Sequence, residues 1–202
     1  MFIQVIQGHV TDRDEIRDAF DAWGNDIAAG ATGWLGTTAG LTHDDMLIAL
    51  VRFDTIENAR ANTMRAEQHQ WWMETSKLFA GDVTIHDCTE IDTYLGGGSD
   101  DAGFVQVIQG RVSDPERLRD LNRRSEGALA THRPEIIGGT VAHHGDGGFT
   151  EAVYFTSEAA AREGEQRELP PELAGFMDQW RSLLSDVRYY DLTEPWLYSP
   201  AR

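Results

Sequence analysis

Two side chains of the types used in proton transfer and anion binding stand in apolar, strand-like segments of the first half of the chain. His86 lies between Ile85 and Asp87, and Arg52 interrupts the apolar segment 49–53. An imidazole titrates near neutral pH and can act as a general base. A guanidinium in apolar surroundings needs an anionic partner or ligand. The pair predicts a site that deprotonates a substrate at His86 and holds its anion at Arg52.

Both residues also have a structural interpretation. His86 fits a hydrogen-bonded core histidine, and Arg52 fits an intrachain ion pair or an outward-facing position. Strand alternation places Thr84, His86 and Cys88 on one face and their neighbours on the other. The more polar face, which carries His86, is the better candidate for the interior of a barrel.

Trp71 and Trp72 are neighbours in a segment with helical spacing. Adjacent helical residues differ by about 100° around the axis, so both cannot face the same core. At least one is expected to pack in the core, and the other to reach the pocket, the linker or a partner surface. In the pocket it would form a flat wall for an aromatic ligand.

Four further side chains are candidates for substrate binding. Tyr154 stands where Arg52 stands in the other half, and Tyr190 precedes Asp191. Gln4 and Gln106 recur at the same position of equivalent strands. The alternatives are ordinary aromatic packing for the tyrosines and a structural role for the repeated glutamines.

No metal or organic cofactor is expected. His143, His144 and Asp146 are close in sequence, but adjacent strand residues point to opposite faces, whereas a metal needs several converging ligands. The single cysteine, Cys88, excludes a site of several thiolates. The glycine-rich turn 144–148 joins two strands. A nucleotide-binding loop would instead lead into a helix.

The chain repeats itself with an offset of 102 residues. Residues 2–18 return as residues 104–120, and without gaps 16 of the 54 positions from Phe2 to Thr55 are identical in the second copy. Each copy predicts a βαββαβ unit. The predicted strands are 2–7, 34–41, 46–53 and 83–91, and then 104–109, 136–143, 149–155 and 187–192.

The predicted helices begin at good N-cap residues. These are Asp12 and Asp114 for the first helix of each copy, and Thr55 and Ser157 for the second. Pro170 and Pro171 are expected to break the second helix in the second copy alone.

The predicted fold is α+β, with two tandem ferredoxin-like units. Repeat 1 spans residues 1–95, a linker spans 96–103, and repeat 2 spans 104–202. A unit with helices on one sheet face leaves the other face uncovered. We therefore expect the units to pack sheet to sheet as a pseudo-dimeric α/β barrel, with two unequal pockets. The molecule would be a monomeric pseudo-dimer or a homodimer of it.

Composition narrows the class of partner. The net charge is −17 and the sequence pI is about 4.6, which argues against nucleic acid and anionic membranes. No apolar run is long enough for a membrane span. The start of the sequence lacks the pattern of a signal peptide, and the single cysteine fits a reduced compartment. A cytoplasmic protein with a small-molecule ligand is expected.

Each copy carries a strand that ends in an aromatic residue, any residue and Thr or Ser, followed by an acidic, alanine-rich helix start. The two segments are Phe53-Asp-Thr-Ile-Glu-Asn-Ala59 and Phe155-Thr-Ser-Glu-Ala-Ala-Ala161. In this the chain resembles the dimeric α/β-barrel superfamily, in particular its antibiotic-biosynthesis-monooxygenase-like branch.

The resemblance implies a cofactor-independent monooxygenase for a small phenol or quinol. His86 would then be the base, Arg52 the anion holder, and Trp71 or Trp72 the wall. A non-catalytic small-molecule-binding protein is the alternative, and haem binding or degradation is a third.

Overall fold

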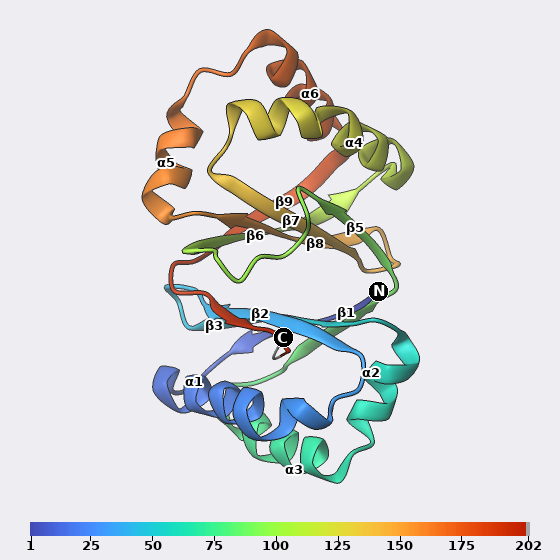
Figure 1. The fold of residues 1–202 in the computed structure, drawn as a ribbon, viewed down its shortest axis with the longest axis vertical. Coiled ribbons are helices and arrows are strands. Elements are labelled where there is room, and N and C mark those ends of the chain that lie inside the picture. Colours follow the sequence, from blue (N-terminus) through green and yellow to red (C-terminus); the bar gives the residue numbers. More distant parts are fainter. Residues whose placement is uncertain (201–202) are drawn as a thin grey trace. The chain divides into compact units, whose positions relative to one another are not determined.

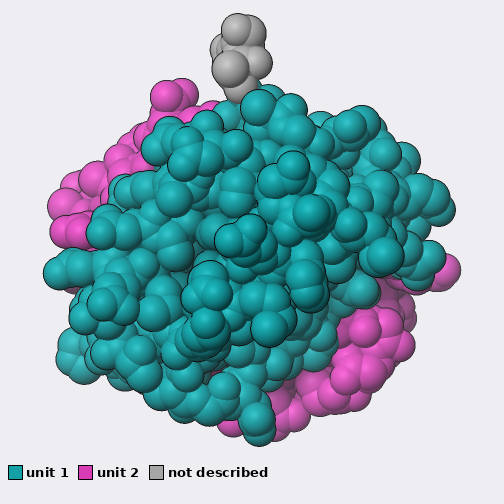
Figure 2. Space-filling model, turned by 90° about the horizontal axis from the view of Figure 1, so that it is seen from below, with its two compact units in different colours: residues 1–89, 196–202 teal, residues 90–195 magenta. Residues whose placement is uncertain are grey.

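The computed structural model describes residues 1–200, and the chain forms two compact units. Unit 1 consists of Met1–Thr89 and the segment that begins at Trp196, and unit 2 consists of Glu90–Pro195. Figure 2 colours the two units separately. The units differ from the sequence repeats at their ends, because the last strand of each repeat joins the sheet of the other unit.

Unit 1 has a five-stranded antiparallel sheet in the order β10-β2-β3-β1-β4. Its strands are β1 (Phe2–His9), β2 (Trp34–Leu41), β3 (Met46–Phe53), β4 (Thr84–Cys88) and β10 (Trp196–Tyr198). Its α-helices are α1 (Arg13–Ala22), α2 (Ile56–Thr63) and α3 (Ala66–Thr75).

Unit 2 has the equivalent antiparallel sheet in the order β5-β7-β8-β6-β9. Its strands are β5 (Glu90–Tyr94), β6 (Phe104–Val112), β7 (Ile136–His143), β8 (Gly148–Phe155) and β9 (Leu184–Leu192). Its helices are α4 (Pro115–His132), α5 (Glu158–Gln166) and α6 (Pro171–Leu183). In each unit the helices lie on one face of the sheet (Figure 1).

Four strands of each sheet have the ferredoxin-like order, so the predicted α+β fold of tandem units is confirmed. The fifth strand of each sheet is exchanged. β5 follows β4 along the chain but pairs with β7, and β10 follows β9 but pairs with β2. We did not predict β10, and the sequence suggested one long strand at 83–91 where the structure has β4 and β5.

The four predicted N-caps are confirmed. The Asp12 carboxylate accepts bonds from two backbone amides of the first turn of α1, and Asp114 accepts one from Arg117 before α4. Thr55 and Ser157 cap α2 and α5 in the same way. These bonds satisfy backbone donors that a helix start leaves unpaired.

The prediction that only the second copy has a broken second helix is wrong, because both copies have it in two pieces. In unit 1 the break lies at Arg65, whose backbone is extended. The Arg65 guanidinium donates to the carbonyl oxygen of Ile27 at 3.2 Å and to Asn62 Oδ1 at 2.9 Å. A long-range contact therefore holds this break, where the sequence has neither proline nor glycine.

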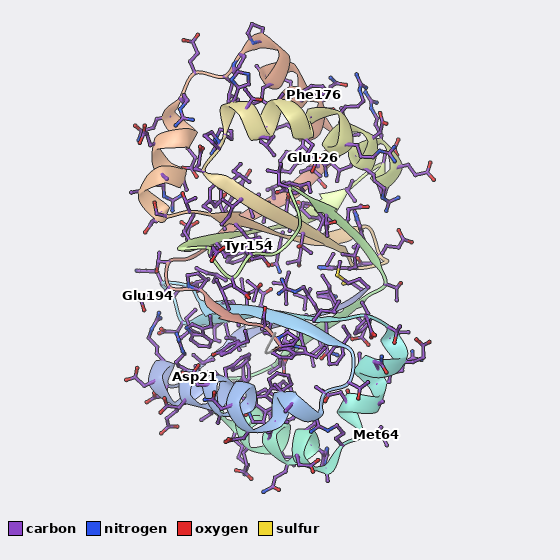
Figure 3. The ribbon with its side chains drawn as sticks, in the orientation of Figure 1. Asp21, Met64, Glu126, Tyr154, Phe176 and Glu194 are labelled. Atoms are coloured by element: carbon purple, nitrogen blue, oxygen red, sulfur yellow. The ribbon has the colours of Figure 1, made fainter. Side chains whose placement is uncertain are left out.

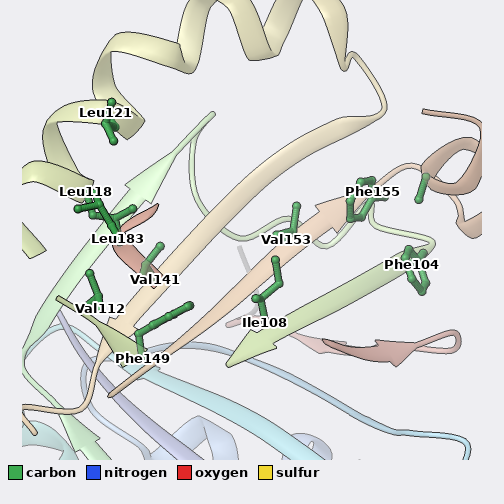
Figure 4. Packing of buried hydrophobic residues seen from close by; sticks show 11 residues of the cluster. Phe104, Ile108, Val112, Leu118, Leu121, Val141, Phe149, Val153, Phe155 and Leu183 are labelled. Atoms are coloured by element: carbon green, nitrogen blue, oxygen red, sulfur yellow. The ribbon is translucent and has the colours of Figure 1, made fainter. Parts of the chain in front are cut away.

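The apolar cores lie between each sheet and its own helices. In unit 2 this core joins β6 and β8 to α4 and α6, as the labelled side chains in Figure 4 show. Phe104, Phe149 and Leu118 are almost fully buried there. No helix among residues 1–200 has the length and apolar character that a membrane crossing requires.

Candidate active site

A cavity of about 510 Å³ lies in unit 1 between the sheet and its helices. Such a volume suits a small organic ligand. Gln4 and Ile6 of β1, Val51 and Phe53 of β3, and Asp87 of β4 form the sheet side.

Aromatic rings form much of the helix side of this cavity. Trp71 of α3 packs edge-on to Phe20 of α1, with ring centroids 5.6 Å apart and an interplanar angle of 78°. Trp72 adjoins Trp71 at 6.1 Å, and Trp23 lies 6.3 Å from Trp71. Trp71 donates its indole N–H to the carbonyl oxygen of Ala19 at 2.9 Å, which fixes its ring. The result is a rigid wall of flat apolar surfaces.

Polar side chains also line this cavity, among them Arg60 and His69, and several others are held by hydrogen bonds. Gln4 Nε2 donates to Asp87 Oδ1 at 2.9 Å across β1 and β4. Gln68 Oε1 accepts from Trp23 Nε1 at 2.6 Å and from Asn62 Nδ2 at 3.2 Å. A cavity that combines aromatic walls with oriented polar groups is typical of ligand sites.

Unit 2 has an equivalent cavity of about 500 Å³, between its sheet and α4, α5 and α6. Phe155, Phe176, Met177 and Trp180 give it apolar walls. Figure 3 shows Phe176 on the helix side of the unit 2 sheet.

Glu151 is a buried carboxyl in the wall of the unit 2 cavity. It lies in the middle of β8, is 6 % exposed, and its Oε1 accepts a hydrogen bond from the Tyr94 hydroxyl at 2.8 Å. Burial raises the pKa of Glu151 to about 7, although the bond from Tyr94 acts to lower it. Burial, and then the nearby Glu151, raise the pKa of Tyr94 well above its usual range. Tyr94 therefore stays a hydrogen-bond donor.

A second polar group in this cavity repeats the pair seen in unit 1. Gln106 Nε2 donates to Asp191 Oδ1 at 3.0 Å, as Gln4 does to Asp87. In unit 2 the aspartate also pairs with Arg162, which contacts Glu158 and Glu165 as well. Each cavity thus has a Gln–Asp pair at the same place on its sheet.

The two cavities differ in the positions that could do chemistry. Ala49 stands in unit 1 where Glu151 stands in unit 2, and Trp23 stands where Ser125 stands. Unit 1 is richer in indole rings, and unit 2 has the buried acid. We predicted unequal pockets because Arg52 and His86 have different residues at the equivalent positions of the second copy. The differences in the linings of these two cavities lie at other positions.

The predicted binding residues divide into two groups. Gln4, Trp71 and Trp72 line the cavity of unit 1, and Gln106 lines that of unit 2. Their role in binding a substrate stays a prediction. The expectation that the two tryptophans face different surroundings is wrong, because both pack against the same apolar cluster. Tyr154 lies on β8 (Figure 3) and is fully buried, but its neighbours Val153 and Phe155 are the ones that line the cavity. Tyr190 is also outside the lining, and its neighbours Tyr189 and Asp191 line the cavity.

The predicted catalytic pair does not line the cavity of unit 1. Val51 and Phe53 face this cavity, so Arg52 between them points to the opposite face of the sheet, where it donates to Thr38 Oγ1 at 3.3 Å. Ile85 and Asp87 also face the cavity, so His86 points away from it. The more polar face of β4, which carries His86, is thus the sheet face away from this cavity. Its predicted place in a barrel interior stays a prediction. A catalytic role for either residue remains a prediction.

The two adjacent histidines diverge, as strand alternation predicts. His143 Nε2 lies 2.9 Å from Asp92 Oδ2, and His144 Nε2 lies 2.9 Å from Thr150 Oγ1. Within residues 1–200, no group of three or more His, Cys, Asp or Glu side chains is arranged to hold a metal ion.

Sequence reasoning missed Glu151 and Tyr94. A signal for Glu151 was present, because alternation along β8 puts this charged residue on the same face as Val153 and Phe155. Tyr94 was assigned to the end of the first repeat. Only the pairing of β5 with β7 brings it to the second cavity.

Comparison with solved structures gives matches over nearly the whole chain. A "putative monooxygenase" from Lactobacillus acidophilus NCFM has a TM-score of 0.74 at 15 % identity, and the match covers 98 % of this chain and 95 % of that one. One from Fusobacterium nucleatum subsp. nucleatum has a TM-score of 0.76 at 10 % identity, with 99 % and 94 % covered. The chain shares the overall fold of these two structures.

An anthrone oxidase-like protein also matches this fold. Its TM-score is 0.63 at 11 % identity, and the match covers 97 % of this chain and 92 % of that chain. At these identities the likeness is one of fold. No family model and no curated protein matches the sequence.

Proposed function

We propose that this chain is a cofactor-independent monooxygenase for a small phenol or quinol. The observation that carries the proposal is the unit 1 cavity, with its wall of indole and phenyl rings and its fixed Gln4–Asp87 pair. The likeness of the whole fold to structures described as monooxygenases and as anthrone oxidase-like supports it.

The proposed reaction needs no external reductant. A phenol with a free para C–H can react with one oxygen molecule to give the para-quinone and one water. The substrate gains one oxygen atom, and its hydroxyl and para hydrogens leave in the water. The substrate supplies all the electrons, so the protein need only bind it, help it to ionise and keep it oriented.

The cavity of unit 1 suits the binding part of this task. Trp71 and Trp72 offer flat surfaces on which an aromatic ring can pack. The buried area and the ring geometry of such contacts both stabilise binding. The Asp87 carboxylate, held by Gln4, can accept a hydrogen bond from a phenolic hydroxyl. Such orientation removes much of the entropic cost of reaction.

Oxygen uptake with a panel of phenols and hydroquinones, after treatment with a chelator, tests the proposal. Wild type should consume oxygen and, from phenols with a free para C–H, form the para-quinone and water. Trp72→Ala should weaken substrate binding about tenfold, since burying an aromatic ring contributes on the order of 1.4 kcal/mol or more. Met73→Ala is the matched control, because Met73 adjoins Trp72 on α3 but is 51 % exposed and lies outside the cavity lining.

The outcomes separate the alternatives. Binding without oxygen uptake for any substrate would favour a non-catalytic binding protein. A Soret band on addition of hemin would favour the haem interpretation. His86→Ala and Arg52→Ala in the same assay test the catalytic roles that we predicted from the sequence.

A further inference from the structure

We propose that the cavity of unit 2 is a second reaction site, in which the Glu151 carboxyl exchanges a proton with a phenol or a related carbon acid and Tyr94 positions that carboxyl. The substrate class rests on the proposed function. The site itself rests on three adjacent strands of unit 2.

Three adjacent strands of the unit 2 sheet bring Tyr94 and Glu151 together. Tyr94 lies on β5 and Glu151 on β8, with β7 between them. Gly139 of β7 pairs with Tyr94, and a Cβ atom built at Gly139 would lie 1.9 Å from Tyr94 Cζ. The ring therefore crosses β7 only because residue 139 has no side chain. Its hydroxyl then reaches Glu151 Oε1 at 2.8 Å.

The Glu151 carboxyl also faces the cavity. Of the residues that the structure describes, Tyr94 is the hydrogen-bond partner of this carboxyl, through Oε1. Oε2 is thus available to a ligand. The apolar walls at Phe176 and Trp180 keep the surroundings of low polarity, which strengthens a hydrogen bond between the carboxyl and a ligand hydroxyl.

The other charged groups of this cavity are already paired. Arg162 of α5 pairs with Asp191 of β9 and with Glu165. Arg133, at the end of α4, pairs with Glu135. Outside the cavity lining, the Leu95 backbone N–H donates to Glu126 Oε1 of α4 at 2.6 Å. Glu151 therefore keeps a neutral partner, Tyr94, and no guanidinium pairs with it.

This arrangement suits a group that both takes and returns protons. A buried carboxyl without a cation resists ionisation, and burial raises the pKa of Glu151 to about 7. A general base is most effective when its pKa lies near the working pH. Near neutral pH Glu151 is present in both protonation states.

The equivalent positions of unit 1 do not form such a tyrosine–carboxyl pair on the sheet. Its equivalent tyrosine, Tyr198 of β10, donates to Asp21 of α1 at 2.7 Å. Thr37 stands in place of Gly139, and Ala49 in place of Glu151. The exchanged strand brings a tyrosine to each cavity, but only in unit 2 does it meet a buried carboxyl on the sheet.

The proposed step is a proton transfer and needs no oxidant. A methylene C–H next to an aromatic ketone breaks, and its electron pair passes into the ring system as the enolate. The proton forms an O–H bond with Glu151 Oε2. In D₂O the carboxyl exchanges this proton with solvent and returns a deuteron to carbon.

Anaerobic deuterium exchange of anthrone in D₂O tests the step apart from any reaction with oxygen. Loss of the methylene proton signal is followed by NMR against a protein-free sample, from about pH 5 to pH 9. Glu151→Gln should slow the protein-dependent exchange about a hundredfold and remove its pH dependence. Glu163→Gln is the matched control, since Glu163 is an exposed carboxylate of α5 outside the cavity lining.

Tyr94→Phe provides a second, independent readout. The bond from Tyr94 favours the ionised carboxylate, so its loss should move the pH midpoint of exchange upward. A purely structural Tyr94 would change the rate without moving this midpoint. The variant keeps the carboxyl, so it remains informative if Glu151→Gln does not fold.

The results separate this inference from the proposed function. Exchange that depends on Glu151, without aerobic oxygen uptake, would uphold the inference and overturn the oxygenase proposal. Oxygen uptake with unchanged exchange in Glu151→Gln would do the reverse. Absence of exchange above background in the wild type, or an unmoved midpoint in Tyr94→Phe, would overturn the inference.

Discussion

Glu151 occupies a position where a carboxylate is costly. It lies at the centre of β8, whose residues are buried throughout, and the Tyr94 hydroxyl partly offsets the loss of water around it. A buried group of this kind shifts its pKa towards the neutral form. Such shifts are frequent at functional sites. Glu151 is therefore a stronger candidate for proton transfer than the predicted His86.

The raised pKa of Glu151 predicts a loss of stability as pH rises. The unfolded carboxyl ionises near pH 4.5 and the folded one near 7, so the folded state binds more protons between these values. Stability should therefore fall across this window, by up to about 3 kcal/mol. Glu151→Gln should lack this loss. Melting temperatures of both proteins from pH 4 to pH 8 measure the difference, and parallel curves would contradict the assignment.

At the scale of elements, the short exchanged strands decide what each cavity contains. β10 has three residues, yet it covers the edge of β2 and brings Trp196 and Tyr198 into unit 1. Trp196 is 5 % exposed, packs 5.6 Å from Phe20, and has Arg17 stacked 5.0 Å above its ring. The last strand of the chain thus completes a core whose other strands lie in the first 88 residues.

Trp196→Ala should destabilise unit 1 by about 3–5 kcal/mol, the usual cost of removing a buried tryptophan. Amide hydrogen exchange should show faster opening of β1–β3 than of β6–β8. Leu35→Ala is the control, since Leu35 lies on β2 but is 44 % exposed, and its effect should be below about 0.5 kcal/mol. Equal effects of the two variants would contradict the assigned role of β10.

At the scale of the whole molecule, the exchange makes neither repeat complete. Residues 1–95 carry β5 without β7 and lack β10, so the edge of β2 is left uncovered. Uncovered edges and apolar faces promote association. The predicted packing of the two sheets remains a prediction.

Expression of residues 1–95 alone should give an aggregate or a homodimer. In a homodimer, β5 of each copy can pair with β2 of the other, as β10 does in the intact chain, because Tyr94 and Tyr198 are equivalent in the repeat. Light scattering coupled to size-exclusion chromatography measures the state. A folded monomer of residues 1–95 would show that the repeat is complete without β10.

Local patterns were enough to predict most elements. The repeat and strand alternation located β2, β3 and β7 with their observed ends, and short polar side chains located the four helix caps. These features depend on neighbours within a few residues, which the sequence shows directly. The break at Arg65 was missed because it depends on a contact with Ile27, far away along the chain.

The sequence by itself determined the duplication, the ferredoxin-like order and the presence of aromatic and amide side chains suited to a pocket. Only the tertiary structure decided which of those side chains face a cavity. Successive residues of a strand point to opposite faces of the sheet, so Asp87 faces the cavity and His86 does not. The pairing of Tyr94 with Glu151 was decided by β5 joining the second sheet, a long-range strand pairing that no local pattern encodes.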